Sequence, residues 1–385
     1  MIQLKDICDI YDCPHTTAKD EGKGYPLVRT PNVGKGRLIL DGIHRVSEDV
    51  YNSRNARAIP EEGDLILARE APVGNVSIIM DGQRVCLGQR VVLIKPKREL
   101  VDPHFLTYYL LSAEVQHRLK NHANGAVVAH LNVSDIRNLW VTLPELEEQV
   151  AIGKILRSID DKIELNRQIN DNLEQQAQAA FNNIIANTTS DKTVQLSEIA
   201  WLNPKRSISK GKVVRSIEMA HLPTTGSFPS GWEMKEYNGG MKFQNGDTLM
   251  ARITPCLENG KVAFVNFLED DEIAFGSTEY ITMTPKRQFA PEVLYFLVRN
   301  AEFIDFAVKN MNGSSGRQRV SADTIGTFEL PDITLEELHM LETIAREALT
   351  KIKYNSLENM RLAEMRDTLL PKLMSGELKI NETDC

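Results

Sequence analysis

The sequence feature that most constrains the fold is a long heptad pattern that occurs twice. From Pro144 to about Ile185, suitable residues recur at alternating steps of four and three, the spacing that keeps one stripe of a helix against a partner. The ten positions of this first seam are Ile152, Leu156, Ile159, Ile163, Asn166, Asn170, Leu173, Ala177, Ala180 and Ile184. At an offset of 189 (341 − 152), the same places hold Leu341, Ala345, Ala348, Ile352, Asn355, Asn359, Leu362, Arg366, Leu369 and Leu373.

Both seams carry two asparagines at matched places, Asn166 and Asn170 in the first and Asn355 and Asn359 in the second. An asparagine in a helix seam costs stability, and its known use is to fix register and partner choice. We therefore predict one duplicated long helix whose two copies pack on each other, with these asparagines setting the register. The alternative is that both segments are ordinary core helices of a larger domain.

A second repeat precedes each helix. The segment Gly63-Asp-Leu-Ile-Leu-Ala-Arg69 matches Gly246-Asp-Thr-Leu-Met-Ala-Arg252, and Pro103 matches Pro291. Composition predicts strands at 64–68, 90–95, 139–143, 248–252, 280–284 and 327–330. A helix is expected to start at each of the two prolines and to continue to about Lys120 and Lys309. The fold class is therefore α+β, with mixed modules alternating with long helices. The predicted boundaries are 1–143, 144–190, 191–330 and 331–385.

Composition indicates a soluble protein, because 42% of the residues are apolar, 25% are charged and no run reaches the ~20 apolar residues of a membrane helix. We expect a cytoplasmic protein without a signal peptide and without a membrane partner. The net charge of −8 argues at first against nucleic acid. The segments 144–190 (8 acidic against 4 basic) and 331–385 (11 against 7) account for all of it, which leaves both modules near neutral. A near-neutral module is compatible with a basic face.

Motifs for catalysis or cofactor binding are absent from the sequence. There is no phosphate-binding G-x-x-x-x-G-K-[ST], no dinucleotide fingerprint and no N-P-P-Y methyltransferase motif. Cys8, Cys13 and His15 have no second ligand pair at a helpful spacing, so no metal site is predicted. We therefore predict no catalytic residue, no metal and no cofactor on this chain.

Loops rich in Arg, Lys, Asn and Gln are candidates for DNA recognition, because these side chains contact phosphates and base edges. The candidates of the first copy are Arg29, Thr30, Asn32, Lys35, Arg37, Arg69 and Arg90. Those of the second copy are Arg252, Lys261, Ser315, Arg317, Gln318 and Arg319. The strongest segment is 314–319, whose counterpart, 125–130, is apolar and lacks arginine. Two copies with different loops are expected to read different sequences, although each residue alone could be ordinary solvated loop charge.

Two further segments carry a resemblance to a known family. Leu143-Pro-Glu-Leu-Glu-Glu-Gln149 leads into the first long helix, and Leu369-Leu-Pro-Lys-Leu-Met-Ser-Gly-Glu-Leu378 closes the second. With the two Gly-Asp segments, they make the chain resemble the specificity subunits of Type I restriction–modification systems over nearly its whole length. The second lead-in, Leu330-Pro-Asp-Ile-Thr-Leu-Glu-Glu-Leu338, departs from the pattern because it lacks the glutamine.

The resemblance implies two target recognition domains, each reading half of a split site on double-stranded DNA, separated by an antiparallel coiled coil of the two helices. It also implies a chain without catalytic activity that docks two methylation subunits, which use S-adenosylmethionine, and restriction (motor–nuclease) subunits. Two other hypotheses remain open at this point. One is a coiled-coil adaptor that binds only proteins, and the other is an enzyme with its own cofactor, such as a DNA methyltransferase.

Overall fold

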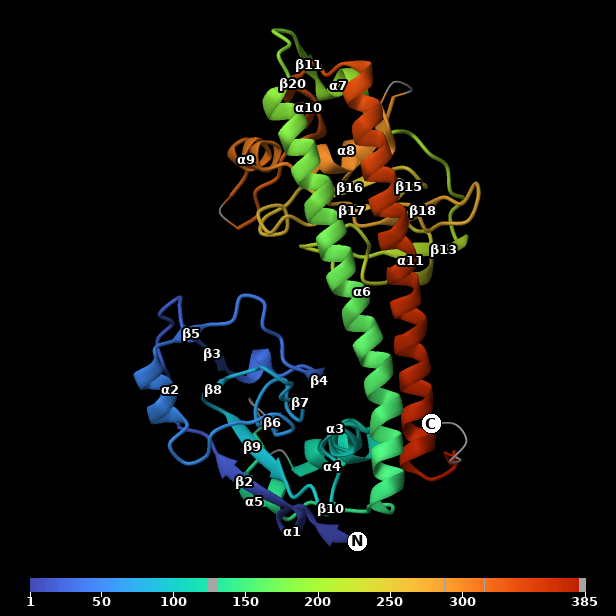
Figure 1. Cartoon of the computed structure of the whole chain (residues 1–385). Helices are drawn as coiled ribbons and strands as arrows, with labels where there is room; N and C mark the ends of the chain where they lie inside the picture. Colours follow the sequence, from blue (N-terminus) through green and yellow to red (C-terminus); the bar gives the residue numbers. More distant parts are fainter. Residues whose placement is uncertain (123–129, 287–288, 315, 381–385) are drawn as a thin grey trace. The chain divides into compact units, whose positions relative to one another are not determined.

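The protein is described by a computed structural model that covers residues 1–122, 130–286, 289–314 and 316–380. The chain forms two compact units, Met1–Lys162 with Leu362–Cys385, and Ile163–Arg361. Each unit contains one α/β module and a segment of both long helices, α6 (Leu146–Asn187) and α11 (Leu335–Met374) (Figure 1). The division between units therefore falls inside the two helices.

The first module is built on a five-stranded sheet of order β2-β9-β6-β7-β4, antiparallel except for the β4–β7 pair. These strands are β2 (Cys8–Asp12), β9 (Val91–Pro96), β6 (Leu65–Ala68), β7 (Val76–Ile78) and β4 (Gly36–Arg37). A three-stranded sheet contains β5 (Arg45–Val46), β3 (Tyr25–Val28) and β8 (Cys86–Leu87), and β1 (Ile2–Gln3) pairs with β10 (Trp140–Val141). The helices are α1 (Leu4–Ile7), a 3-10 turn η1 (Thr30–Asn32), α2 (Glu48–Arg54), α3 (Pro103–Leu111), α4 (Ala113–His122) and α5 (Val133–Arg137).

The second module repeats this plan, since its main sheet has the order β12-β19-β16-β17, which matches β2-β9-β6-β7. The strands are β12 (Ala200–Leu202), β19 (Tyr280–Pro285), β16 (Thr248–Ala251) and β17 (Val262–Phe264). A further sheet contains β14 (Glu233–Glu236), β13 (Val213–Ile217), β18 (Ala274–Gly276) and β15 (Met241–Phe243), and β11 (Thr193–Gln195) pairs with β20 (Glu329–Pro331). The helices are α7 (Leu196–Ile199), α8 (Pro291–Val298), α9 (Ala301–Lys309) and α10 (Ala322–Gly326).

The helix expected after each matched proline is interrupted in both modules, so the prediction of one continuous helix was wrong. Between α3 and α4, Ser112 takes an extended conformation, with φ −61° and ψ 148°. Between α8 and α9, the side chain of Asn300 accepts hydrogen bonds from the backbone N–H groups of Glu302 and Phe303, which starts a new helix. Serine and asparagine compete for backbone hydrogen bonds and favour such caps over helix interiors.

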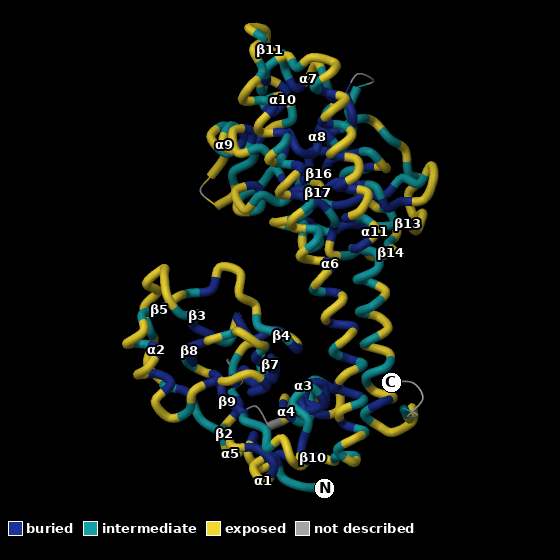
Figure 2. Tube along the Cα trace, in the orientation of Figure 1, coloured by how far each residue is buried: buried dark blue, intermediate teal, exposed yellow. Residues whose placement is uncertain are grey.

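Figure 2 shows α3 and the strands β16 and β17 among the buried parts of the chain.

The Gly-Asp repeat has the same structural role in both modules. Gly63 and Gly246 have φ of 83° and 90°, a backbone conformation that residues with a Cβ rarely adopt. The following aspartates close the turn, because Asp64 accepts the backbone N–H of Glu61 at 2.8 Å and Asp247 accepts that of Gln244 at 2.7 Å. The glycine and the aspartate thus place β6 and β16 at the centre of their sheets.

The long helices pair with opposite directions inside each unit. In the first unit, Asp160 of α6 contacts Arg366 of α11 at 2.8 Å. In the second unit, Asn170 contacts Asn355 at 2.8 Å, and at the far end Thr188 contacts Glu337 at 3.5 Å. Partner numbers fall on α11 as they rise on α6, so the helices are antiparallel. All twenty predicted seam residues are buried or half-buried, and the predicted fold class is confirmed.

The four seam asparagines contact one another or the facing helix. Asn166 donates to the Oδ1 of Asn359 at 2.9 Å, and Asn355 donates to the Oδ1 of Asn170 at 2.8 Å. Asn359 also donates to the carbonyl of Ile163 at 3.2 Å. A shift of one helix along the other would separate these partners and leave buried amides unpaired, which is costly. That the asparagines set the register stays a prediction.

Candidate nucleic-acid interface

Arg69, which follows β6, is held inside the first module. Its side chain is 8% exposed, and its three nitrogens contact the carbonyl of Leu131 at 2.8 Å, Asp12 at 2.7 Å and the Nε2 of His130 at 2.8 Å. Its backbone N–H and C=O also hydrogen-bond to Arg90 and Leu131. In this conformation Arg69 joins three segments of the module, and each of its guanidinium nitrogens contacts a protein group.

Arg90 reaches the surface beside this buried arginine. Its side chain is 57% exposed and forms a 2.7 Å ion pair with Glu70, which is 16% exposed. Glu70 also lies 3.1 Å from the Nδ1 of His130. Sequence reasoning passed over Glu70 and His130. The signal that could have found them is their position in the sequence. Glu70 directly follows Arg69, and His130 is the residue of the first copy that matches Arg319 in the second.

The second module has a different set of side chains at the matching backbone places. The backbone of Arg252 bonds to Glu279 and Val320, as that of Arg69 bonds to Arg90 and Leu131. Glu279 therefore takes the place of Arg90, and the residue before Val320, Arg319, takes the place of His130. A site of arginines, a glutamate and a histidine in the first module becomes a site of two arginines around one glutamate in the second.

Arg319 and Glu279 form the tightest ion pair of this second site. The Nε of Arg319 lies 2.9 Å and 3.0 Å from the two carboxylate oxygens, and its Nη2 lies 2.7 Å from one of them. The hydrogen-bonded Arg319 guanidinium lowers the pKa of Glu279 below its usual value, and Arg252, whose Nε is 4.0 Å away, adds to this effect. Glu279 could not be predicted from the sequence by residue type, because an acidic side chain is not among those that contact phosphates.

Arg317 lies in a tight loop whose ends are joined by two hydrogen bonds of 2.9 Å between the backbones of Asn312 and Arg319. Gly313 and Gly316 in this loop have φ of 130° and 77°. The Arg317 side chain is exposed and forms no hydrogen bond or ion pair with the described residues. It is therefore free to contact a ligand.

Two other candidates of the second module, Gln318 and Lys261, are more constrained. Gln318 is half-buried, and its backbone is joined to Thr254 by hydrogen bonds of 2.9 Å and 3.0 Å. The Nζ of Lys261 donates to the carbonyl of Met219 at 2.6 Å. Ser315, and the segment 123–129 that contains most of the corresponding first-copy loop, lie outside the described residues.

The segment 29–37 of the first module divides into three environments. Asn32 is buried and closes the η1 turn, accepting the backbone N–H of Arg29 at 3.1 Å and donating to the carbonyl of Ile39 at 3.2 Å. Arg29 and Thr30 are half-buried, and Lys35 is exposed at a cleft of about 720 Å³ that α4 and α11 also line. Arg37 forms an ion pair with Asp161 of α6. As DNA contacts, all the candidate residues of both modules stay predictions.

Neither a metal cluster nor a membrane helix is found in the described part of the chain. No group of three or more His, Cys, Asp or Glu side chains there could hold a metal ion. Among the same residues, no helix is both long enough and apolar enough to cross a membrane.

Comparison with known proteins shows which family the first part of the chain is similar to. Residues 1–175 match the family described as the Type I restriction modification DNA specificity domain. The match covers less than half of the 385-residue chain, which is therefore similar to this family over its first module and much of α6.

Two curated relatives are also similar to the chain in sequence, and one solved structure is similar to it in fold. Both relatives are Type I restriction enzyme specificity subunits from Methanocaldococcus jannaschii. MjaIX is 24% identical over 99% of this chain and 93% of its own length. MjaVIII is 27% identical over 47% of this chain, but that match spans only 44% of the relative. The fold resembles the S subunit of a Type I restriction–modification system from M. genitalium, with a TM-score of 0.58, 17% identity and coverage of 97% and 95% of the two chains.

Proposed function

We propose that this chain reads a split DNA site, one half with each module, for a Type I restriction–modification complex. The observation that carries the proposal is the change of side chains at matched backbone places, from Arg69, Arg90 and His130 to Arg252, Glu279 and Arg319. A repeated scaffold with different recognition side chains is suited to reading two different sequences. The chain itself then needs no catalytic residue.

The partners follow from the same proposal. Two methylation subunits, which carry S-adenosylmethionine, bind the chain and methylate the site that it selects. Restriction subunits join them in the cutting complex. The regions 1–143 and 191–330 act as the target recognition domains, while 144–190 and 331–385 hold the helices. The four seam asparagines maintain the register of these helices.

Single-molecule methylome sequencing of cells that express the chain with its cognate methylation subunit tests this function. We expect a split methylated motif that disappears when the gene for this chain is deleted. Exchange of residues 191–330 for those of another specificity subunit is expected to change one half of the motif only. Methylation that persists unchanged without the chain would leave the protein-only adaptor as the better description.

Arg317 gives a prediction at the level of one side chain. The side chain of Arg317 is exposed and forms no hydrogen bond or ion pair with the described residues. Arg317→Ala is therefore expected to weaken binding of the complete complex to its site by about 1–3 kcal/mol if the residue reads a base. If Arg317 contacts only a phosphate, the loss will be similar for all sequences and the slope of log K against log salt will fall by about 1. Fluorescence anisotropy at several salt concentrations separates the two cases. Arg317→Lys is the control that keeps the charge, and unchanged affinity in Arg317→Ala would remove this residue from the interface.

A further inference from the structure

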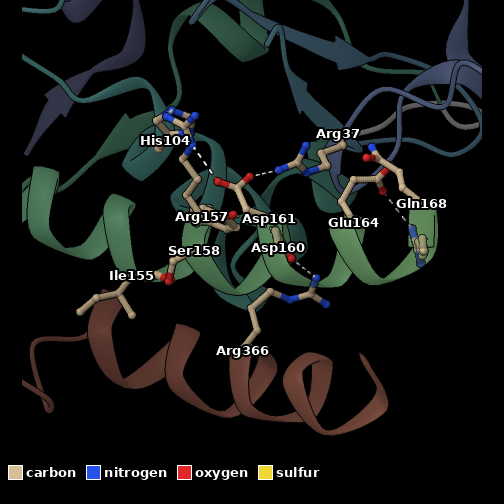
Figure 3. A network of polar contacts seen from close by, with 12 residues as sticks. Arg37, His104, Ile155, Arg157, Ser158, Asp160, Asp161, Glu164, Gln168 and Arg366 are labelled. Carbon is tan, nitrogen blue, oxygen red and sulfur yellow. Dashed lines mark hydrogen bonds and ion pairs between the residues drawn. The ribbon is translucent and has the colours of Figure 1, made fainter. Parts of the chain in front are cut away.

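Arg37 connects the first module to the long helix α6. Its guanidinium forms an ion pair with Asp161 of α6 and, in the close view, points toward that helix (Figure 3). The other carboxylate oxygen of Asp161 lies 3.3 Å from the Nε of Arg157, one turn earlier. The Nη1 of Arg157 lies 3.0 Å from the Nε2 of His104 at the start of α3. Burial, aided by the charge of Arg157, lowers the pKa of His104, which favours the neutral imidazole, the form that can accept this hydrogen bond.

The neighbouring Asp160 points the other way, toward α11 (Figure 3). One of its oxygens accepts the hydroxyl of Tyr108, on α3, at 2.7 Å. The other lies 2.8 Å from the Nη1 of Arg366, on α11. The Asp160 side chain is only 10% exposed, so these contacts are made away from water, where charge-assisted hydrogen bonds are strong. One carboxylate therefore joins α3, α6 and α11.

The β4 segment lies against α6, and its backbone conformation at Gly36 favours glycine. Gly36 has φ 91°, and a Cβ at this position would lie 3.4 Å from the Oδ2 of Asp160. The strand that carries Arg37 thus rests directly on the turn of α6 that carries both aspartates. The side chain of Arg37, the next residue, therefore contacts α6 and does not extend over the exposed surface of the module.

These contacts join the module to α6 through two of its elements, α3 and β4. Tyr108 and His104 both come from α3. Arg37 comes from β4, an edge strand of the main sheet, and adds a contact from this second element. Its ion pair is partly exposed, with side-chain exposures of 30% for Arg37 and 45% for Asp161. Such a pair is expected to add little to folding stability.

We propose that Arg37 is a positioning residue: its pairing with Asp161 fixes the angle of the first module on α6, and thereby the spacer length accepted between the half-sites. The proposal rests on the proposed function and departs from the sequence-based prediction that Arg37 contacts DNA. It predicts that loss of the pair changes the distance at which two half-sites are recognised, while the bases read in each half stay the same.

Charge reversal provides the test. Complexes carrying Arg37→Glu, Asp161→Arg or both changes, each with the cognate methylation subunit, are given a library of duplexes in which the half-sites and the spacer are randomised. We expect each single change to raise the share of methylated duplexes with a spacer one base pair too long or too short by about fivefold. The double change restores the salt bridge and is expected to restore the original spacer. Lys154→Glu, on an exposed residue of the same helix without a contact in the described structure, is the matched control.

The outcome of this experiment decides the proposal. Altered bases in the first half-site of the Arg37→Glu complex would show that Arg37 reads DNA, and spacer preferences identical to the wild type would show that the pair positions nothing. Either would overturn it. Thermal unfolding of each complex identifies variants that do not fold. The milder Asp161→Asn then replaces them, with a smaller broadening of the spacer expected and an unchanged spacer again counting against the proposal. A wild-type complex that methylates no split motif would instead contradict the proposed function.

Discussion

Asp247→Ala is expected to lower the free energy of unfolding of the second module by about 3–5 kcal/mol, the usual loss when one partner of a buried ion pair is removed. Asp247 is fully buried, and Arg206, its partner at 2.8 Å, is 7% exposed. Arg206 also donates to the hydroxyl of Thr284 at 2.9 Å. Burial raises the pKa of the Asp247 carboxyl, while Arg206, Thr284 and the backbone N–H of Gln244 oppose that shift by stabilising the ionised form. Without Asp247, the Arg206 guanidinium would remain buried without its counter-charge.

Urea unfolding followed by tryptophan fluorescence measures this loss, because Trp201 and Trp232 both lie in the second module. The double change Arg206→Met with Asp247→Leu is expected to be much less harmful than either single change, since apolar side chains can replace a buried pair. Lys95→Ala is the matched control in the first module, where Lys95 contacts Asp64 at 2.6 Å but is 24% exposed. Its loss is expected to be smaller. A loss below about 1 kcal/mol in Asp247→Ala would mean that the pair behaves like one at the surface.

Periodic features of the sequence were enough to predict the architecture. The heptad seams and the matched Gly-Asp segments predicted paired long helices and duplicated modules, because spacing along a helix or strand determines which side chains share a face. The break after α3 was not predicted, since Ser112 is compatible with both a helix interior and a cap. What decides between them is the packing of the following residues, which involves contacts distant in the sequence.

The candidate site was less predictable than the fold. Residue type identified arginines, yet Arg69 and Arg90 differ completely in the structure, one buried among Asp12, Leu131 and His130 and the other exposed beside Glu70. Sequence alone could not separate them, because the partners of Arg69 come from segments 57 to 62 residues away. Asp161, the partner of Arg37, is 124 residues away. Long-range partners of this kind decide whether a cation is available to DNA.

A heptad inserted into both long helices is expected to lengthen the spacer of the recognised DNA site and leave both half-sites unchanged. The structure indicates where to insert it: after Asn170 in α6 and before Asn355 in α11, because these two residues face each other at 2.8 Å. Seven residues at both places preserve the heptad seam, and the contact between Asn166 and Asn359 stays intact. The insertion leaves Asp161, which pairs with Arg37, unchanged. It also leaves Glu174 unchanged, which accepts the hydroxyl of Tyr295 and lies 3.8 Å from the Nε of Arg299 in the second module.

The expected size of this change follows from helix geometry. Seven residues add about 10 Å to an α-helix, which corresponds to about three base pairs of DNA. Three base pairs also turn the DNA by roughly 100°, at about 10.5 base pairs per turn, whereas a heptad turns the helix by only about 20°. The lengthened complex therefore has to twist or bend its DNA, and its affinity should fall below that of the wild type because DNA deformation costs energy.

Methylation of a library with randomised spacers measures both effects. The control is the same heptad inserted into α6 alone, which shifts all seam residues after Asn170 against α11 and should lower the thermal unfolding temperature without producing a new spacer. If the doubly lengthened protein is folded and still methylates sites with the original spacer, the length of the helices does not set the distance between half-sites. A longer spacer with unchanged half-sites would assign distance to the helices and sequence to the modules, which is the separation of roles that a duplicated reader on a paired-helix scaffold requires.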